Sequence, residues 1–205
     1  MDVMTDRWPR FPLGELSEII AGPSGSRAPV LDGFASGVPV VQSKNLRGNR
    51  ILAEGLSMVP SEVASALARF RVEEGDVLCT RTGDVGRRAR VRKDQEGWLF
   101  GSSCLRIRPA GRLVPSYLSH FLAQPDSKAW FKRNVNGSAI LGLTTKAMKS
   151  MPVVLPPVDV QLAIGEILDS LDDKVTIHEE IGRATAALRD ALFPELLATP
   201  PAELR

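Results

Sequence analysis

The densest run of basic side chains in the sequence lies within residues 75–93, where it forms a candidate site for binding phosphates. Gly83 and Gly86 allow the positive φ of a tight turn, so this segment is expected to form a strand, a turn and a second strand. Alternate residues of a strand share a face, which would place the guanidinium groups of Arg88, Arg90 and Arg92 about 6.8 Å apart. Such a row suits a phosphate backbone, although a solvated strand face has the same pattern. The candidate phosphate contacts in this segment are Arg81, Thr82, Arg87, Arg88 and Arg90.

Two further loops are rich in side chains that can pair with base edges and phosphates. The first follows an apolar run and the second precedes a Thr-Thr-Lys sequence. Asn, Ser and Gly are also favoured in ordinary turns, so composition leaves both interpretations open. The candidate nucleic-acid contacts are Ser43, Lys44, Asn45 and Arg47 in the first loop, and Asn136, Ser138, Thr144, Thr145 and Lys146 in and after the second.

Groups that perform catalysis or hold a metal ion are sparse. The chain has two histidines and two cysteines, Cys79 and Cys104, without CxxC spacing. The sequence contains no phosphate-binding loop, no HExxH pair, no dinucleotide fingerprint and no methyltransferase tetrad. We therefore expect no enzymatic activity, no metal and no cofactor. A hydrolase that uses Asp76, Asp84 or His120 is the catalytic alternative, and the sequence offers it no base–nucleophile pair.

The formal net charge of +2 hides a division along the chain. Residues 1–158 hold 22 Lys plus Arg and 14 Asp plus Glu, a net charge of +8, whereas residues 159–205 hold 4 and 10, a net charge of −6. A basic domain indicates a polyanionic partner, because neutralised phosphates release counterions. A solvated basic face remains the alternative on charge alone.

The elements that must position these groups belong to an α+β fold. Apolar runs bounded by turn residues predict strands at 38–41, 76–80, 98–100, 104–108 and 152–155, and helical patterns cover 61–70, 115–123 and 126–135. No apolar run is long enough to span a membrane and the N-terminus lacks a signal-peptide pattern, so we expect a cytoplasmic protein without membrane contact.

A long helix is predicted over residues 159–193, from an N-cap at Asp159 to Pro194, which would end or kink it. At 1.5 Å per residue this helix is roughly 50 Å long. Its apolar residues follow an imperfect heptad repeat, interrupted by polar residues such as His178, and are expected to pack on another helix. The candidate seam residues are Ile164, Ile167, Leu171, Ile181, Leu188 and Leu192.

Three stretches of the sequence form a recognisable pattern: Gly75-Asp76-Val77-Leu78, Arg81-x-Gly83-x-x-Gly86-Arg87, and Leu155-Pro156-Pro157-x-x-x-Gln161-x-x-Ile164-x-x-Ile167-Leu168-x-x-Leu171-Asp172-x-x-Val175. Through them the sequence resembles the specificity subunit of Type I restriction-modification systems over nearly its whole length. Val160 departs from the family pattern, which usually has an acidic residue before the glutamine that is Gln161 here.

The resemblance implies a target recognition domain at 1–158, with a mixed curved sheet and flanking helices, followed by a coiled-coil dimerisation or spacer helix and tail at 159–205. In that family the domain reads half of a bipartite site in double-stranded DNA, a DNA methyltransferase subunit docks on the frame, and a restriction (motor-nuclease) subunit can join. The family subunit has two recognition domains and two helices, and this sequence has one of each. It is therefore either a natural half-subunit that forms a homodimer through the helix, with an interrupted palindrome as its site, or a fragment.

One alternative function belongs to a different class. Gly83-x-x-Gly86 imitates the GXXG loop with which a KH domain clamps RNA, and a basic domain suits RNA as well as DNA. A KH domain also needs helices around that loop, and no helix-turn-helix pattern supports the match. The alternative is an RNA-binding module.

Overall fold

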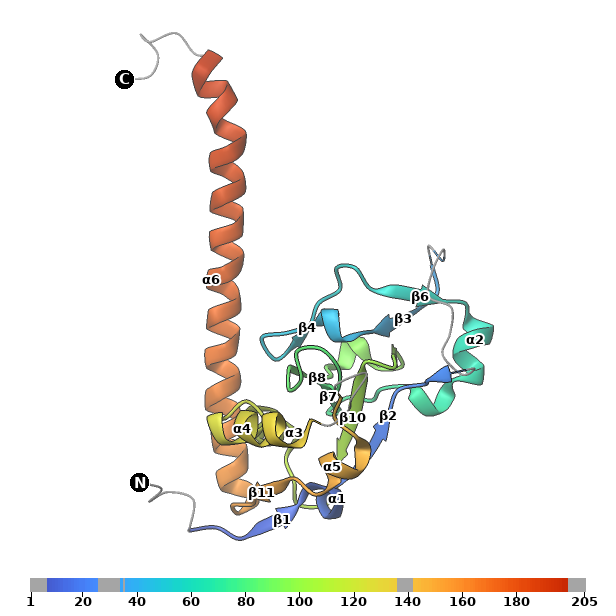
Figure 1. Ribbon diagram of the computed structural model, residues 1–205. Helices are drawn as coiled ribbons and strands as arrows, with labels where there is room; N and C mark the ends of the chain where they lie inside the picture. Colours follow the sequence, from blue (N-terminus) through green and yellow to red (C-terminus); the bar gives the residue numbers. More distant parts are fainter. Residues whose placement is uncertain (1–6, 26–33, 35, 136–141, 199–205) are drawn as a thin grey trace. The chain divides into compact units, whose positions relative to one another are not determined.

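The chain divides into two compact units, Met1–Glu166 and Ile167–Arg205, which we call the N-terminal and C-terminal units. The structure, a computed structural model, describes residues 7–25, 34, 36–135 and 142–198 (Figure 1). Both predicted fold features, the α+β class and the long C-terminal helix, are confirmed.

A four-stranded antiparallel sheet lies at the centre of the N-terminal unit. Its order is β2 (Ser17–Ala21), β10 (Cys104–Pro109), β7 (Val77–Thr80) and β8 (Arg88–Arg90). All four residues of β7 are buried, because both faces of the sheet are covered. Cys79 belongs to the core on one face and its neighbour Leu78 to the core on the other, as period-two geometry requires.

Helices cover one face of this sheet and a second sheet covers the other. The first core contains residues of short helices and of the antiparallel pair β1–β11, and the second contains residues of a three-stranded sheet in the order β6-β3-β9. The first group comprises α1 (Leu13–Leu16), α3 (Pro115–Phe121), α4 (Pro125–Asn134), α5 (Thr145–Lys149), β1 (Arg10–Pro12) and β11 (Pro152–Val154). The second comprises β3 (Val38–Val41), β6 (Ser57–Val59), β9 (Leu99–Phe100), α2 (Ser61–Ala66) and the hairpin of β4 (Leu46–Arg47) and β5 (Arg50–Ile51).

The predicted strands at 38–41, 76–80, 98–100, 104–108 and 152–155 each match an observed strand to within one residue at either end. The sequence patterns do not predict β1, β2, β4, β5, β6, α1 or α5. The predicted helix at 61–70 is interrupted at Leu67, where α2 gives way to the 3-10 helix η3 (Ala68–Phe70). The second basic strand is shorter than predicted, since β8 ends at Arg90 and Arg92 precedes the 3-10 helix η4 (Lys93–Gln95).

Charged side chains are buried beneath the central sheet. Asp76 is 1% exposed, and its carboxylate accepts hydrogen bonds from Nε (2.7 Å) and Nη2 (2.8 Å) of Arg108 and from the backbone N–H of Glu73 (2.8 Å). Arg106 is 4% exposed and donates to the carbonyl of Arg71 (2.7 Å). Burial lowers the pKa of Arg106, whereas the hydrogen bonds that Arg108 donates to Asp76 raise the pKa of Arg108.

The helix α6 runs from Val158 to Ala198 and continues through Pro194, contrary to the predicted end at residue 193. Proline has no N–H to donate to the carbonyl four residues earlier, but the loss of that single bond does not end a helix of 41 residues. No helix in the described part of the chain is long and apolar enough to cross a membrane.

Candidate nucleic-acid interface

The turn between β7 and β8 presents the predicted basic run. Gly83 and Gly86 both have positive φ, 74° and 93°, as the turn prediction required. Oγ1 of Thr80 accepts a hydrogen bond from the backbone N–H of Arg87 (3.0 Å) and so ties the two strands together across the turn. A Cβ on Gly86 would lie 2.6 Å from the ring of Phe131, so α4 packs directly beneath this turn.

The arginines of this segment have different surroundings. Nε of Arg87 lies 3.1 Å from a carboxylate oxygen of Asp84, and the two side chains are 40% and 73% exposed. Nε of Arg88 donates to the backbone carbonyl of Ser119 in α3 (2.9 Å), which directs this guanidinium toward the protein. Arg90 is half-buried and Arg92 is exposed beyond the end of the strand. The predicted row of three equivalent guanidinium groups is therefore wrong, because β8 is too short and α3 covers part of its face.

The first polar loop forms the 3-10 helix η2 (Ser43–Asn45) and the start of β4. Asn45 is 1% exposed, and its amide accepts from the N–H of Gln42 (2.9 Å) and donates to the carbonyl of Glu54 (3.2 Å). We therefore remove Asn45 from the candidate DNA contacts, since its side chain holds the loop in shape. Lys44 and Arg47 are exposed and Ser43 is half-buried.

The second polar loop is described only from Gly142 onward; Asn136 and Ser138 lie outside the described residues. Oγ1 of Thr144 accepts from the N–H of Ala147 (3.0 Å) and caps α5, while Thr145 is half-buried and Lys146 is exposed. The loop is attached to the β7–β8 turn through a bridge between Thr82 and Gly142 and a hydrogen bond from the N–H of Leu143 to the carbonyl of Arg81 (2.7 Å).

Ser103, which sequence reasoning missed, connects the loops. Its Oγ accepts from the N–H of Ser43 (2.8 Å) and donates to the side-chain oxygen of Gln42 (2.7 Å), and its carbonyl accepts from the N–H of Arg81 (2.9 Å). Three segments that are far apart in the sequence therefore meet at one place. We call this set, residues 43–47, 81–88 and 142–146, the loop cluster. Only the small polar pair Ser102-Ser103 before a strand could have hinted at this role.

Helix α4 adds basic side chains that the sequence interpretation did not include. Lys128 and Lys132 are exposed on the helix whose Phe131 packs beneath Gly86. They add positive charge to the helix that packs beneath the β7–β8 turn, with Asp84 of the turn and Asp126 of the same helix as opposing charges.

The alternative sites are not supported by their surroundings. Gly83-x-x-Gly86 joins two antiparallel strands, whereas a KH loop joins helices, so the RNA interpretation loses its structural basis. Asp76 is committed to Arg108, and His120 is 5% exposed within α3. Burial raises the pKa of both cysteine thiols to about 12, which makes them poor nucleophiles at neutral pH. Among the described residues, no group of three His, Cys, Asp or Glu side chains could hold a metal ion.

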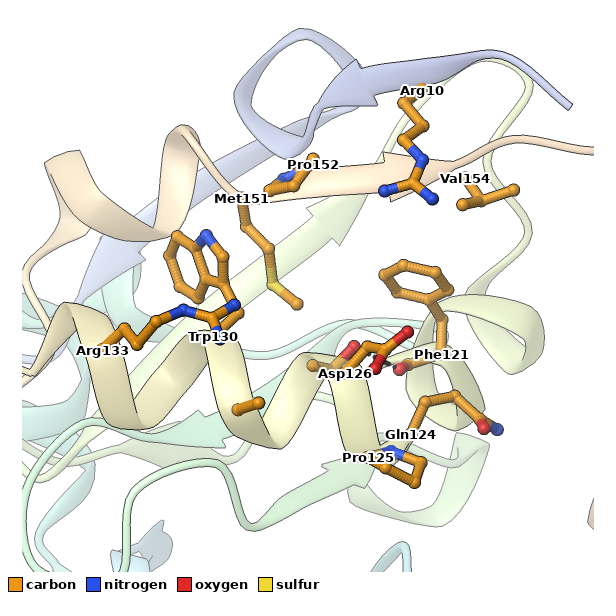
Figure 2. A pocket seen from close by; sticks show the side chains of 12 residues that line it. Arg10, Phe121, Gln124, Pro125, Asp126, Trp130, Arg133, Met151, Pro152 and Val154 are labelled. Carbon is orange, nitrogen blue, oxygen red and sulfur yellow. Dashed lines mark hydrogen bonds between the residues drawn. The ribbon is translucent and has the colours of Figure 1, made fainter. Parts of the chain in front are cut away.

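A pocket of about 430 Å³ lies between α4 and the β1–β11 pair. Figure 2 shows Arg10 reaching from β1 toward α4 and Arg133 beside Trp130. None of the predicted DNA contacts lines this pocket, so it is separate from the loop cluster.

The predicted seam of α6 also separates into two parts. Ile164 packs against the first core of the N-terminal unit, so it contributes to that unit as well. The other five seam residues, Ile167, Leu171, Ile181, Leu188 and Leu192, are exposed, with fractions from 39% to 62%.

The structure combines a basic α+β domain, loops that converge in the loop cluster, and a following helix with an apolar stripe. This combination is expected of a nucleic-acid specificity module. The chain belongs to the family of Type I restriction modification DNA specificity domains, whose family model matches residues 5–184.

The known proteins that are similar to this chain match it over different shares of its length. The putative type I restriction enzyme MjaX specificity subunit of Methanocaldococcus jannaschii is 27% identical over 71% of this chain and 36% of its own length. The HindI specificity subunit of Haemophilus influenzae is 23% identical over 91% of this chain and 40% of its own length. The crystal structure of the HsdS subunit from Thermoanaerobacter tengcongensis has the same fold, with a TM-score of 0.55 and 19% identity over 85% of this chain and 39% of that one. The chain thus spans about two fifths of these relatives.

Proposed function

We propose that this chain is a DNA-recognition subunit that directs a DNA methyltransferase to a bipartite site in double-stranded DNA and performs no catalysis itself. The observation that carries the proposal is the loop cluster, in which Ser103 holds the first loop and the β7–β8 turn in fixed register. Rigidly supported loops with exposed Lys and Arg side chains suit a nucleic-acid groove.

Within the loop cluster the residues have two roles. Base readers are expected among Ser43, Lys44 and Arg47 of the first loop and among Thr144, Thr145 and Lys146 of the second, with Asn136 and Ser138 retained as predictions. Arg81, Thr82, Arg87 and Arg90 line or adjoin the turn and are expected to contact phosphates, which position the domain without reading sequence. Arg88 is expected to act mainly through α3, because its Nε donates to Ser119.

The exposed apolar side chains of α6 support the homodimer as part of this proposal. Two antiparallel copies of the helix would cover Ile167, Leu171, Ile181 and Leu188 by a closed two-fold pairing. Two identical readers related by such an axis would recognise inverted half-sites, so the whole site would be an interrupted palindrome. A methyltransferase subunit, joined in restricting systems by a motor-nuclease subunit, would dock on this frame.

Methylome sequencing of cells tests this proposal. The chain is expressed with the methyltransferase encoded beside it, in a host without other adenine methylation, and modified positions are read from single molecules. We expect one interrupted palindromic motif. Replacing the candidate base readers of both loops, while Asn45, Leu46, Leu143 and Thr144 are kept because they are buried or cap α5, should change the motif while the protein stays folded and dimeric. The residues replaced are Ser43, Lys44, Arg47, Asn136, Ser138, Thr145 and Lys146.

Three results would contradict the proposal. One is a motif that survives this replacement in both loops. Another is methylation that does not depend on this chain. The third is tighter binding to structured RNA than to DNA of matched length at the same salt concentration, which would restore the RNA-binding alternative.

A further inference from the structure

Gln161 is a fully buried polar side chain in the first turns of α6. Its Oε1 accepts from the N–H of Val114 (2.9 Å), and its Nε2 donates to the carbonyls of Arg112 (3.0 Å) and Pro156 (2.8 Å). One amide therefore joins the start of α6 to two other segments of the N-terminal unit. Few side chains can replace it, because the position needs one acceptor and two donors on the same planar group.

A second contact lies one helical turn further on. A Cβ on Gly165 would lie 2.1 Å from Oγ and 2.8 Å from Cβ of Ser116, so only glycine lets the helix backbone approach the start of α3 this closely. Residues four apart share one helix face. Gln161 and Gly165 therefore attach α6 to the N-terminal unit at two points along one face, with Ile164 packed against the first core between them.

Both contacts lie within the N-terminal unit, which ends at Glu166. Gln161 and Gly165 are the only buried residues of α6 in the described part of the chain. Two points along a helix define the direction of its axis, whereas one point would act as a pivot. The first turns of α6 are thus held in direction as well as in position.

We infer that Gln161 and Gly165 are positioning residues that set the spacer length between the two half-sites of the DNA. This inference rests on the proposed function, in which α6 joins two readers. Adding one base pair to a spacer moves a half-site by about 3.4 Å and rotates it by about 34°. A recognition domain held in direction cannot follow this movement without breaking its joint with the helix, whereas a pivoting one can.

The test measures binding of the full chain, with its methyltransferase, to duplexes that carry both half-sites at the native spacer or at spacers one and two base pairs longer or shorter. The wild-type protein should prefer the native spacer by at least about tenfold, comparable to one mismatched base pair. Gln161→Met keeps the side-chain length but removes all three hydrogen bonds. It should reduce this preference to within about threefold, while selectivity for the half-site sequence is retained.

A second pair of variants tests whether a loss of spacer preference comes from the contact between α6 and α3 rather than from unfolding. Gly165→Ala should also weaken the spacer preference, because the new Cβ pushes the helix away from Ser116. Combining it with Ser116→Gly removes the two closest atoms and leaves the N–H nitrogen of Tyr117 as the nearest, at 3.3 Å. The double variant should recover much of the spacer preference. Leu162→Gln is the matched control, since Leu162 is 54% exposed on the same turns, and it should behave as wild type.

The outcomes separate the two proposals. Failure of the wild-type protein to bind any bipartite site would overturn the proposed function. A wild-type protein that selects one spacer, with Gln161→Met and Gly165→Ala variants that are folded and equally selective, would overturn the inference alone. So would a double variant that is no more selective than Gly165→Ala.

Discussion

The N-terminal and C-terminal units differ in which side chains they bury and which they expose. The N-terminal unit buries charged and polar groups, including Asp76, Arg106 and Gln161, and gives each of them hydrogen bonds from within the unit. The C-terminal unit exposes large apolar side chains, among them Ile167 at 62% and Leu188 at 59%. Buried polar groups with partners indicate a domain that is complete by itself, whereas a long exposed apolar stripe indicates a surface that is covered in the assembled protein.

The contrast is sharpest within α6, which belongs to both units. In its first two turns the buried residues are Gln161 and Gly165, which pack against the N-terminal unit. Its later turns carry leucine and isoleucine side chains that are exposed to solvent. The start of the helix is thus suited to packing on the preceding domain, and its later turns are suited to the partner helix of the proposed dimer. Its hydrophobic residues alone would not reveal this difference.

The largest effect is expected when charges are placed on the exposed stripe. Changing Leu171 and Leu188 to Glu should abolish dimerisation, because a dimer would bury four carboxylates without partners. We expect the dissociation constant to rise at least about a hundredfold, since several kcal/mol are lost. Sedimentation equilibrium measures this change, and DNA binding should weaken in parallel because each monomer reads one half-site.

A matched variant distinguishes the loss of apolar contacts at the helix seam from the effect of an added negative charge elsewhere on the helix. Arg183→Glu changes the charge at a position on the opposite face of the heptad and should leave the dimer intact. A wild-type chain that is monomeric at tens of micromolar, and remains so with the methyltransferase, would instead favour a fragment that needs its other half.

A smaller effect is expected in the N-terminal unit. Asp76→Asn removes the charge that pairs with Arg108 and lies 3.9 Å from Nε of the buried Arg106. Breaking one side of a buried ion pair costs about 3–5 kcal/mol, so the midpoint of urea unfolding should fall markedly. The oligomeric state of the Asp76→Asn protein should stay unchanged as long as its N-terminal unit remains folded.

Glu73→Gln is the control for this prediction. Glu73 contacts the same Arg108 at 2.7 Å but its side chain is 60% exposed, so its loss should cost at most about 1 kcal/mol. Equal destabilisation by both variants would mean that burial does not decide the strength of this network.

Sequence reasoning predicted the strands at residues 38–41 and 104–108 because apolar runs bounded by turn residues are local signals. It could not predict the loop cluster, since Ser43 and Ser103 are 60 residues apart and meet through one hydroxyl. Strand alternation alone places Arg88 on a solvent-facing row, because the approach of α3 depends on packing that the alternation does not contain. Gln161 stands out in the sequence only through the family resemblance, because two of its three backbone partners, Val114 and Arg112, are 47 and 49 residues away.

The smallest effect is expected on the β7–β8 turn, where two neighbouring arginines differ in their partners. Arg87 lies beside the exposed Asp84, whereas Arg88 donates to the carbonyl of Ser119 in α3. Arg87→Ala should weaken binding to all DNA sequences alike and lower the slope of log affinity against log salt by about one, because one phosphate contact is lost. Arg88→Ala should change this slope less and instead destabilise the N-terminal unit by about 1 kcal/mol, since its Nε donates to Ser119. Salt titrations of DNA binding and urea unfolding separate the two effects. An Arg87→Ala protein that recognised a different motif with unchanged non-specific affinity would show that Arg87 reads bases, and equal slopes for both variants would show that α3 does not withdraw Arg88 from the DNA.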